Sequence, residues 1–132
     1  MTRRLLLLAA CLTGCNLLAP AAISDPLQFV SLFQLINKPI GYAGQRVGVT
    51  GYAGDPFREH LFISEDHSKI GDISSSVRVH WPDEVPEKCF NKFMRVEGKF
   101  GRRNTGEFSI YNIERISTLD ESSGLITTCW SS

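Results

Sequence analysis

Two distant segments of the chain, 47–51 and 94–98, share one pattern: apolar residues stand at the first and third positions and glycine stands at the fifth. Alternation with a period of two predicts a strand with one face toward a core and the other toward solvent. Glycine at the end of such a run suits a sharply bent strand, because no Cβ crowds the bend. The pattern therefore favours strands that curve around a small barrel.

Alternation of this kind predicts five strands. They are placed at residues 46–52, 60–64, 75–81, 93–100 and 107–116. Residues 83–93 predict a short helical connection, which Pro86 breaks early. In the last strand Ile113 and Ile116 fall out of phase with the residues before them, which predicts a bulge or bend near Asn112.

An apolar stripe precedes the first strand. Leu32 and Leu35, within residues 27–37, keep helical spacing, so this segment predicts a short N-terminal helix. Ser31 offers the alternative start of a shorter helix, because serine is a favoured N-cap residue. Pro39 follows the stripe and ends the helix in either case.

Three strands, a helical connection and two further strands give the chain order of the OB-fold, a five-stranded and partly open barrel. We therefore expect a mainly β, OB-like barrel over residues 27–132, with a short N-terminal helix and a short helical connection between strands three and four. No element is predicted for the mostly polar tail that begins at Ser117.

The start of the chain predicts an export signal. Arg3 and Arg4 precede an apolar run, 5–12, that is shorter than the about 20 residues of a membrane-spanning helix. Residues 12–15, Leu-Thr-Gly-Cys, resemble a bacterial lipobox. That resemblance implies cleavage before Cys15 and lipid attached to its thiol, which would anchor the protein to a bilayer.

We thus expect a lipoprotein-type signal peptide at 1–14 and a tether at 15–26. Asn16 follows the anchor in place of aspartate, which by resemblance to Gram-negative sorting favours the outer membrane, facing the periplasm. The alternative is ordinary cleavage after Ala21, because residues 19–21 read Ala-Pro-Ala. That cleavage would leave a soluble periplasmic protein.

Either cleavage leaves two cysteines, Cys89 and Cys129, in a compartment where disulfides persist. We expect them to pair, and the bond would hold the polar tail against the segment before the fourth strand. Two buried thiols are the alternative.

Charge argues against nucleic acid as a partner. The chain has 14 basic and 14 acidic residues, and removal of residues 1–14 takes away Arg3 and Arg4, which leaves a slight excess of acid. Proteins that bind through phosphate contacts are usually basic.

Three stretches carry a resemblance to known proteins. They are 30–52 (VSLFQLINKPIGYAGQRVGVTGY), 61–64 (LFIS) and 96–98 (VEG). The chain resembles here a group of small uncharacterised bacterial exported proteins and lipoproteins, which combine a short helix, a V-x-V-x-G strand and an OB-like body. The shared positions are turns, glycines and core residues, so the resemblance implies the fold and no catalytic residue.

Basic and aromatic residues gather on the predicted fourth and fifth strands and the loop between them. The candidate binding residues are Arg95, Lys99, Arg102, Arg103 and Tyr111. Cationic and aromatic groups together suit acidic glycans, lipid head groups or an acidic protein face. A solvated turn that keeps a sheet edge polar is the alternative interpretation.

Residues with catalytic or metal-binding chemistry show no recognisable spacing. His60 and His80 could meet across neighbouring strands, but the sequence lacks the ligand spacing of a zinc site. Residues 66–68 read Asp-His-Ser, yet adjacent residues do not normally align as a catalytic triad. We therefore expect no enzyme, no metal and no cofactor.

The function expected from these features is that of a non-catalytic envelope lipoprotein, held at the membrane by its lipid, which serves as a protein-interaction or accessory module. A small-molecule or glycan-binding OB module is the alternative, and it should depend on an aromatic residue such as Tyr52, Trp81 or Tyr111. A hydrolytic or metal-dependent enzyme is the third hypothesis. The expected partner is thus an envelope protein or a glycan.

Overall fold

The computed structural model of the chain describes residues 25–104 and 106–132. The expected signal peptide at 1–14, the lipid site at Cys15 and most of the tether lie outside the described residues. The alternative cleavage after Ala21 lies outside them as well.

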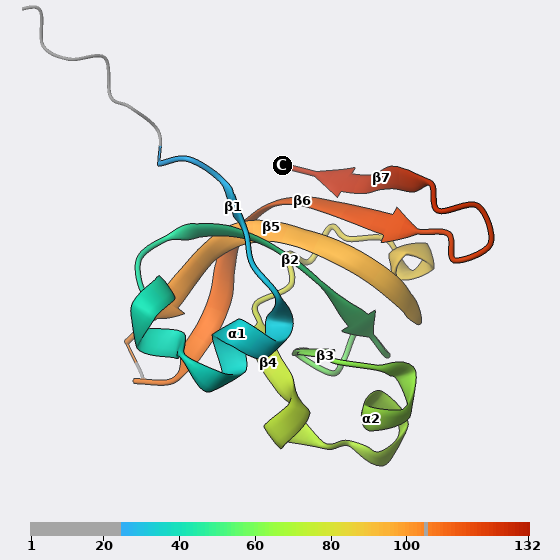
Figure 1. Cartoon of the computed structure of the whole chain (residues 1–132). Helices are drawn as coiled ribbons and strands as arrows, with labels where there is room; N and C mark the ends of the chain where they lie inside the picture. Colours follow the sequence, from blue (N-terminus) through green and yellow to red (C-terminus); the bar gives the residue numbers. More distant parts are fainter. Residues whose placement is uncertain (1–24, 105) are drawn as a thin grey trace, which may run out of the picture.

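Five strands close into a barrel (Figure 1). They are β2 (Arg46–Ala53), β3 (His60–Phe62), β4 (Ser76–Val79), β5 (Lys92–Arg102) and β6 (Phe108–Leu119). Their order is β2-β3-β4-β6-β5, and β5 pairs with β2 to complete the ring. All of these pairs are antiparallel except β4 with β6. The predicted mainly β, five-stranded, OB-like barrel is confirmed.

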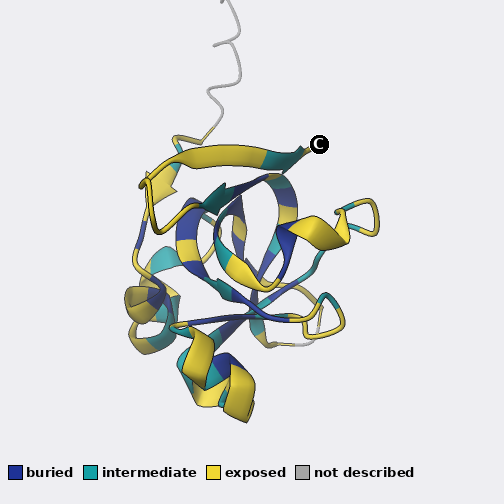
Figure 2. Cartoon of the chain, turned by 90° about the vertical axis from the view of Figure 1, so that its right-hand side faces the viewer, coloured by how far each residue is buried: buried dark blue, intermediate teal, exposed yellow. Residues whose placement is uncertain are grey.

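Every second residue of the strands points into the barrel and fills it, and Figure 2 shows buried and exposed positions alternating along the strands. The inward residues of β2, β4 and β5 are at most 6% exposed: Val47, Val49, Val77, Val79, Met94 and Val96. Burial of one such side chain stabilises a fold by about 1.5–3 kcal/mol. Glu97 is a buried charged residue on the outer face of β5, and the guanidinium of Arg115 lies 3.5 Å from its carboxylate.

The two repeated glycines lie where strands approach closely. A Cβ at Gly51 would come within 2.7 Å of Leu61 Cγ and 2.8 Å of the Phe62 carbonyl oxygen. A Cβ at Gly98 would lie 2.9 Å from the carbonyl oxygen of Tyr111. Both glycines therefore let neighbouring strands come together at the bends of the barrel, as the sequence pattern predicts.

The bulge predicted near Asn112 is confirmed. Lys99 pairs with Tyr111, whereas Glu97 pairs with Arg115, so the residues between them on β6 face only Gly98 on β5. Asn112 itself adopts a left-handed backbone, with φ of 48°. The extra residues shift the phase of β6, which explains how its later isoleucines also reach the core.

The N-terminal helix is the shorter of the two alternatives. It is α1 (Leu32–Asn37), and Ser31 caps it in a capping box with Gln34. The residues ahead of it are extended instead of helical, because β1 (Gln28–Phe29) pairs in parallel with β2. A helix beginning at residue 27 is therefore wrong. The 3-10 turn η1 (Pro39–Tyr42) follows α1.

Four further elements complete the chain. They are α2 (Glu65–Ile70), η2 (Ile73–Ser75), η3 (Glu87–Cys89) and β7 (Ile126–Ser131). The helical connection predicted between strands three and four is the single 3-10 turn η3. The sequence predicted neither α2 nor β7: α2 has Ser68 as its buried residue, and β7 is an edge strand that pairs only with β6 among the described strands.

The predicted disulfide is formed. Cys89 on η3 and Cys129 on β7 are bonded, with their Cα atoms 5.9 Å apart. Cys89 is fully buried, so the bond joins the edge strand to the core of the barrel.

Replacement of Gly51 by alanine should destabilise the barrel by about 1–3 kcal/mol, because the added methyl group meets a backbone oxygen that cannot move alone. Gly41→Ala is the matched control, since no neighbouring heavy atom lies within 4 Å of its added Cβ. Urea unfolding measures both. Equal stability of the two variants would contradict this role of Gly51.

Removal of the disulfide, as Cys89→Ala with Cys129→Ala, should lower the free energy of unfolding by about 2–4 kcal/mol. The loop that the bond closes is long, with a sequence separation of 40. Hydrogen exchange should accelerate more in β7 than in β2, because the closed ring still holds β2. Unchanged exchange in β7 would show that the bond does not hold this strand.

Candidate functional site

The structure spreads the candidate binding residues along β5 and β6. Arg95 and Lys99 lie on the outer face of β5, and Lys99 is opposite Tyr111 on β6. The guanidinium of Arg103 lies 5.5 Å from the centre of the Tyr111 ring. Lys99, Tyr111 and Arg103 therefore form one neighbourhood, and Arg95 lies farther along the same strand.

Arg102 does not join this neighbourhood. Its guanidinium lies 4.4 Å from the centre of the Phe108 ring, and that ring stacks on the buried Phe100 at a centroid distance of 5.5 Å. Arg102 thus covers aromatic side chains at one end of the core.

A second candidate lies on the other side of the ring, over β3 and β4. We call it the β3–β4 groove; it holds about 430 Å³ and is lined by Phe57, Arg58, Glu59, His60, Phe62, Gly71, Ile73 and Arg78. In OB-folds, the face of strands two and three and the loops beside it bind ligands. β3 and β4 are the second and third strands of this barrel, so the groove occupies that face.

Apolar side chains form the rims and the floor of the groove. Phe57, in the β2–β3 loop, is 89% exposed, and Ile73 on η2 is 61% exposed, whereas Phe62 is fully buried. The loop is fixed by a turn in which the backbone N–H of Phe57 donates to the carboxylate of Asp55, at 2.9 Å. The phenylalanine ring is therefore presented to solvent by an ordered turn.

Arg78 joins the β2–β3 loop, which lines the groove, to the loop that precedes β6. Its guanidinium donates to Glu59 at 2.7 Å and to Glu107 at 2.9 Å. These hydrogen bonds raise the pKa of Arg78, and the two carboxylates offset its charge. The pairs are about half exposed and are worth roughly 0.2–1 kcal/mol each. Their main effect is to fix the loops relative to β4.

His60 lies in the wall of the groove. Its Nδ1 is 3.0 Å from the hydroxyl of Ser76, and its ring centroid is 6.1 Å from that of Phe62. Burial lowers the pKa of His60, and the positive charge of Arg78 lowers it further. The neutral form of His60 therefore predominates at neutral pH.

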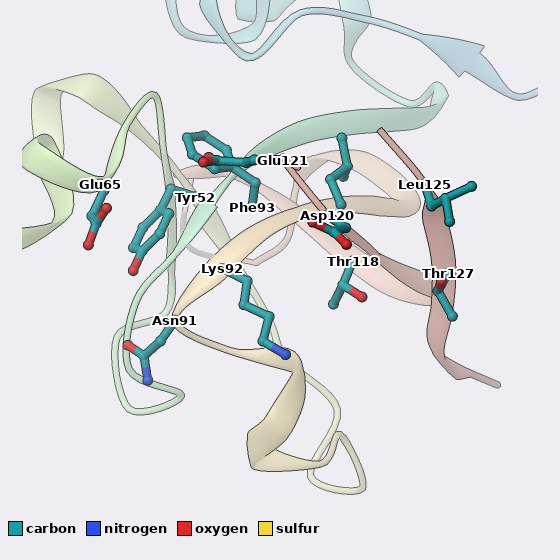
Figure 3. A pocket seen from close by; sticks show the side chains of 11 residues that line it. Tyr52, Glu65, Asn91, Lys92, Phe93, Thr118, Asp120, Glu121, Leu125 and Thr127 are labelled. Carbon is teal, nitrogen blue, oxygen red and sulfur yellow. The ribbon is translucent and has the colours of Figure 1, made fainter. Parts of the chain in front are cut away.

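A third hollow lies between β2, the start of β5 and the β6–β7 hairpin (Figure 3). It holds about 510 Å³, and Tyr52 packs edge-on against Phe93 in its wall at 5.4 Å. Two of its three carboxylates have partners: Glu65 pairs with Lys69, and Asp120 accepts hydrogen bonds from Ser122. Burial raises the pKa of Tyr52. This hollow is more polar than the β3–β4 groove.

The Asp66-His67-Ser68 run lies on α2, where Nδ1 of His67 is 2.6 Å from the hydroxyl of the capping Ser64. The described part of the chain contains no group of three or more His, Cys, Asp or Glu side chains placed to hold a metal ion.

Sequence reasoning missed the apolar residues of the groove. Phe57 stands alone in a polar loop, between Pro56 and Arg58, and one apolar residue carries no periodicity. An isolated aromatic in a loop was the available signal, but only the fold brings it beside Ile73.

Comparisons with protein-family models, curated proteins and solved structures gave no match to this chain.

NMR titration of His60 should give a midpoint below the ordinary histidine value of about 6.5. The sign follows from burial: the folded state disfavours the charged imidazole, so stability falls as pH drops through the ordinary pKa toward the lowered one. Arg78→Met should move the midpoint upward, because it removes a nearby positive charge. A midpoint at or above 6.5 in the unmodified protein would contradict this account.

Proposed function

We propose that this protein is a non-catalytic binding module of the bacterial cell envelope, anchored by lipid at Cys15, which recruits a protein partner through the β3–β4 groove. One observation carries the proposal: Phe57 and Ile73, both largely exposed, flank a hollow on the ligand-binding face of an OB-like barrel.

The chemistry of the groove favours a protein partner. Exposed apolar side chains gathered at one hollow are typical of protein interaction sites, and buried aromatic anchors supply most of the binding energy in such interfaces. Arg58 and Arg78 are matched in number by Glu59 and Glu107, so the groove lacks the excess positive charge that phosphates require. An apolar side chain of a partner, inserted between Phe57 and Ile73, fits this surface.

Two features support the envelope as the location. The signal-like start and the lipobox-like 12–15 run predict export, and the Cys89–Cys129 bond suits an oxidising compartment. No helix among the described residues is long and apolar enough to cross a membrane.

A glycan-binding module is the second candidate, favoured by the hollow of Figure 3. Tyr52 offers an aromatic face there, and Asn91 and Glu121 offer polar groups for sugar hydroxyls. Tyr52→Ala should abolish binding to such a ligand and leave binding through the β3–β4 groove intact.

A photo-crosslinking phenylalanine at position 57 should capture the partner in living cells, whereas the same residue at position 33 should not. Phe33 is a matched control because it is 65% exposed on α1 and does not line the groove. With the captured partner purified, Phe57→Ala should weaken binding about tenfold, equivalent to roughly 1.4 kcal/mol, as expected for an aromatic anchor.

Phe33→Ala should leave the affinity unchanged. The proposal fails if both positions crosslink alike, or if Phe57→Ala binds the purified partner as tightly as the unmodified protein.

A further inference from the structure

We propose that the outer face of β5, with β1 and the start of β6 beside it, docks against an anionic phospholipid surface and so turns the β3–β4 groove away from the bilayer. This inference rests on the lipid anchor of the proposed function. We call the surface the basic face and define it by Phe29, Arg95, Lys99, Arg103 and Tyr111.

The cations of this face lack carboxylate partners. Two neighbouring arginines are paired, Arg46 with Glu114 at 2.6 Å and Arg115 with Glu97 at 3.5 Å. In contrast, no carboxylate in 25–104 or 106–132 forms an ion pair with Arg95, Lys99 or Arg103. The surface therefore carries three positive charges that an anionic partner can offset.

An exposed aromatic ring adjoins these charges. Phe29 on β1 is 65% exposed, and its ring lies over Gly48, where a Cβ would come within 2.8 Å of it. The guanidinium of Arg95 lies 4.9 Å from the centre of the same ring. Aromatic and cationic side chains side by side are typical of surfaces that bind at the level of lipid head groups.

The anchor would enter at the edge of this face. The carbonyl oxygen of Asp25 accepts a hydrogen bond from Arg46 at 3.4 Å, and Arg46 is opposite Lys99 in the β2–β5 ladder. A lipid on Cys15 is then separated from Asp25 by a segment that spans at most about 35 Å when fully extended. The bilayer is therefore within reach of the basic face.

This placement favours lipid over an acidic protein. Once the anchor holds the domain at the bilayer, the effective concentration of head groups is high, so a few unpaired cations suffice for docking. In Figure 1, β1 and the C-terminus lie at one end of the molecule, whereas β3 and α2 lie at the opposite end. Docking through the basic face thus leaves the groove open.

The test uses the mature, lipidated protein reconstituted into vesicles of phosphatidylcholine alone or mixed with phosphatidylglycerol. A fluorescent amino acid is placed at Thr50, which is exposed on β2 opposite Arg95, or at Ile73 in the groove. A lipid with a nitroxide on its head group serves as quencher. We expect quenching at Thr50 and not at Ile73, only in the mixed vesicles, and loss of it in high salt.

The double variant Lys99→Glu with Arg103→Glu should lower the quenching at Thr50 to the level seen at Ile73. Lys69→Glu with Lys88→Glu is the control, because it changes the charge equally with two exposed lysines of α2 and η3. Thermal melting confirms that both variants fold.

Equal quenching at Thr50 and Ile73, or equal quenching in both kinds of vesicle, would overturn the docking proposal. A change in the fluorescence at Thr50 that appears only when an envelope extract is added would overturn it too, in favour of an acidic partner. The mass of the intact protein reports the lipid at Cys15 separately. If that lipid is absent, the anchor of the proposed function fails, whereas quenching at Thr50 still decides whether this face binds phosphatidylglycerol.

Discussion

The ladder between β2 and β5 is the constraint on which the rest of the structure depends. It turns five strands into a closed ring, in which two glycines let other strand pairs approach where a Cβ would collide: Gly51 of β2 against β3, and Gly98 of β5 against β6. With the ring closed, alternate residues of each strand face either a shared core or the outside. The two proposed binding surfaces are therefore outer faces of the same ring, fixed relative to each other by a shared core.

Closure also explains why the two candidate surfaces point apart. β3 and β4 present the groove, and β5, with β1 and β6 beside it, presents the basic face from another part of the ring (Figure 1). In the groove, Arg78 joins the β2–β3 loop to the loop that precedes β6. The basic face is extended by β1, whose Phe29 ring lies over Gly48. A domain anchored through the chain ahead of β1 would thus display its groove to the surroundings.

Local patterns predicted what depends on local physics. Alternation of apolar residues predicted the five barrel strands, and the change of phase along β6 predicted the bulge at Asn112. The oxidising compartment expected for an exported protein predicted the Cys89–Cys129 bond. β7 was beyond such reasoning, because pairing with β6 and the disulfide hold a threonine-rich tail that shows no apolar alternation of its own. The candidate site was predicted only in part. Arg102 packs over Phe108, and Phe57 comes to line the same groove as Ile73 only through folding.

Three exposed phenylalanines allow one direct measurement of the central claim, that the protein works through two opposite faces at the envelope. Phe29 belongs to the basic face, Phe57 to the groove, and Phe33 to neither. Hydroxyl-radical footprinting should compare their oxidation in intact envelopes with that in the purified protein. The account predicts protection of Phe29 and Phe57 in envelopes, with Phe33 reacting equally in both. Oxidation of Phe57 to the same extent in envelopes as in the purified protein would contradict it.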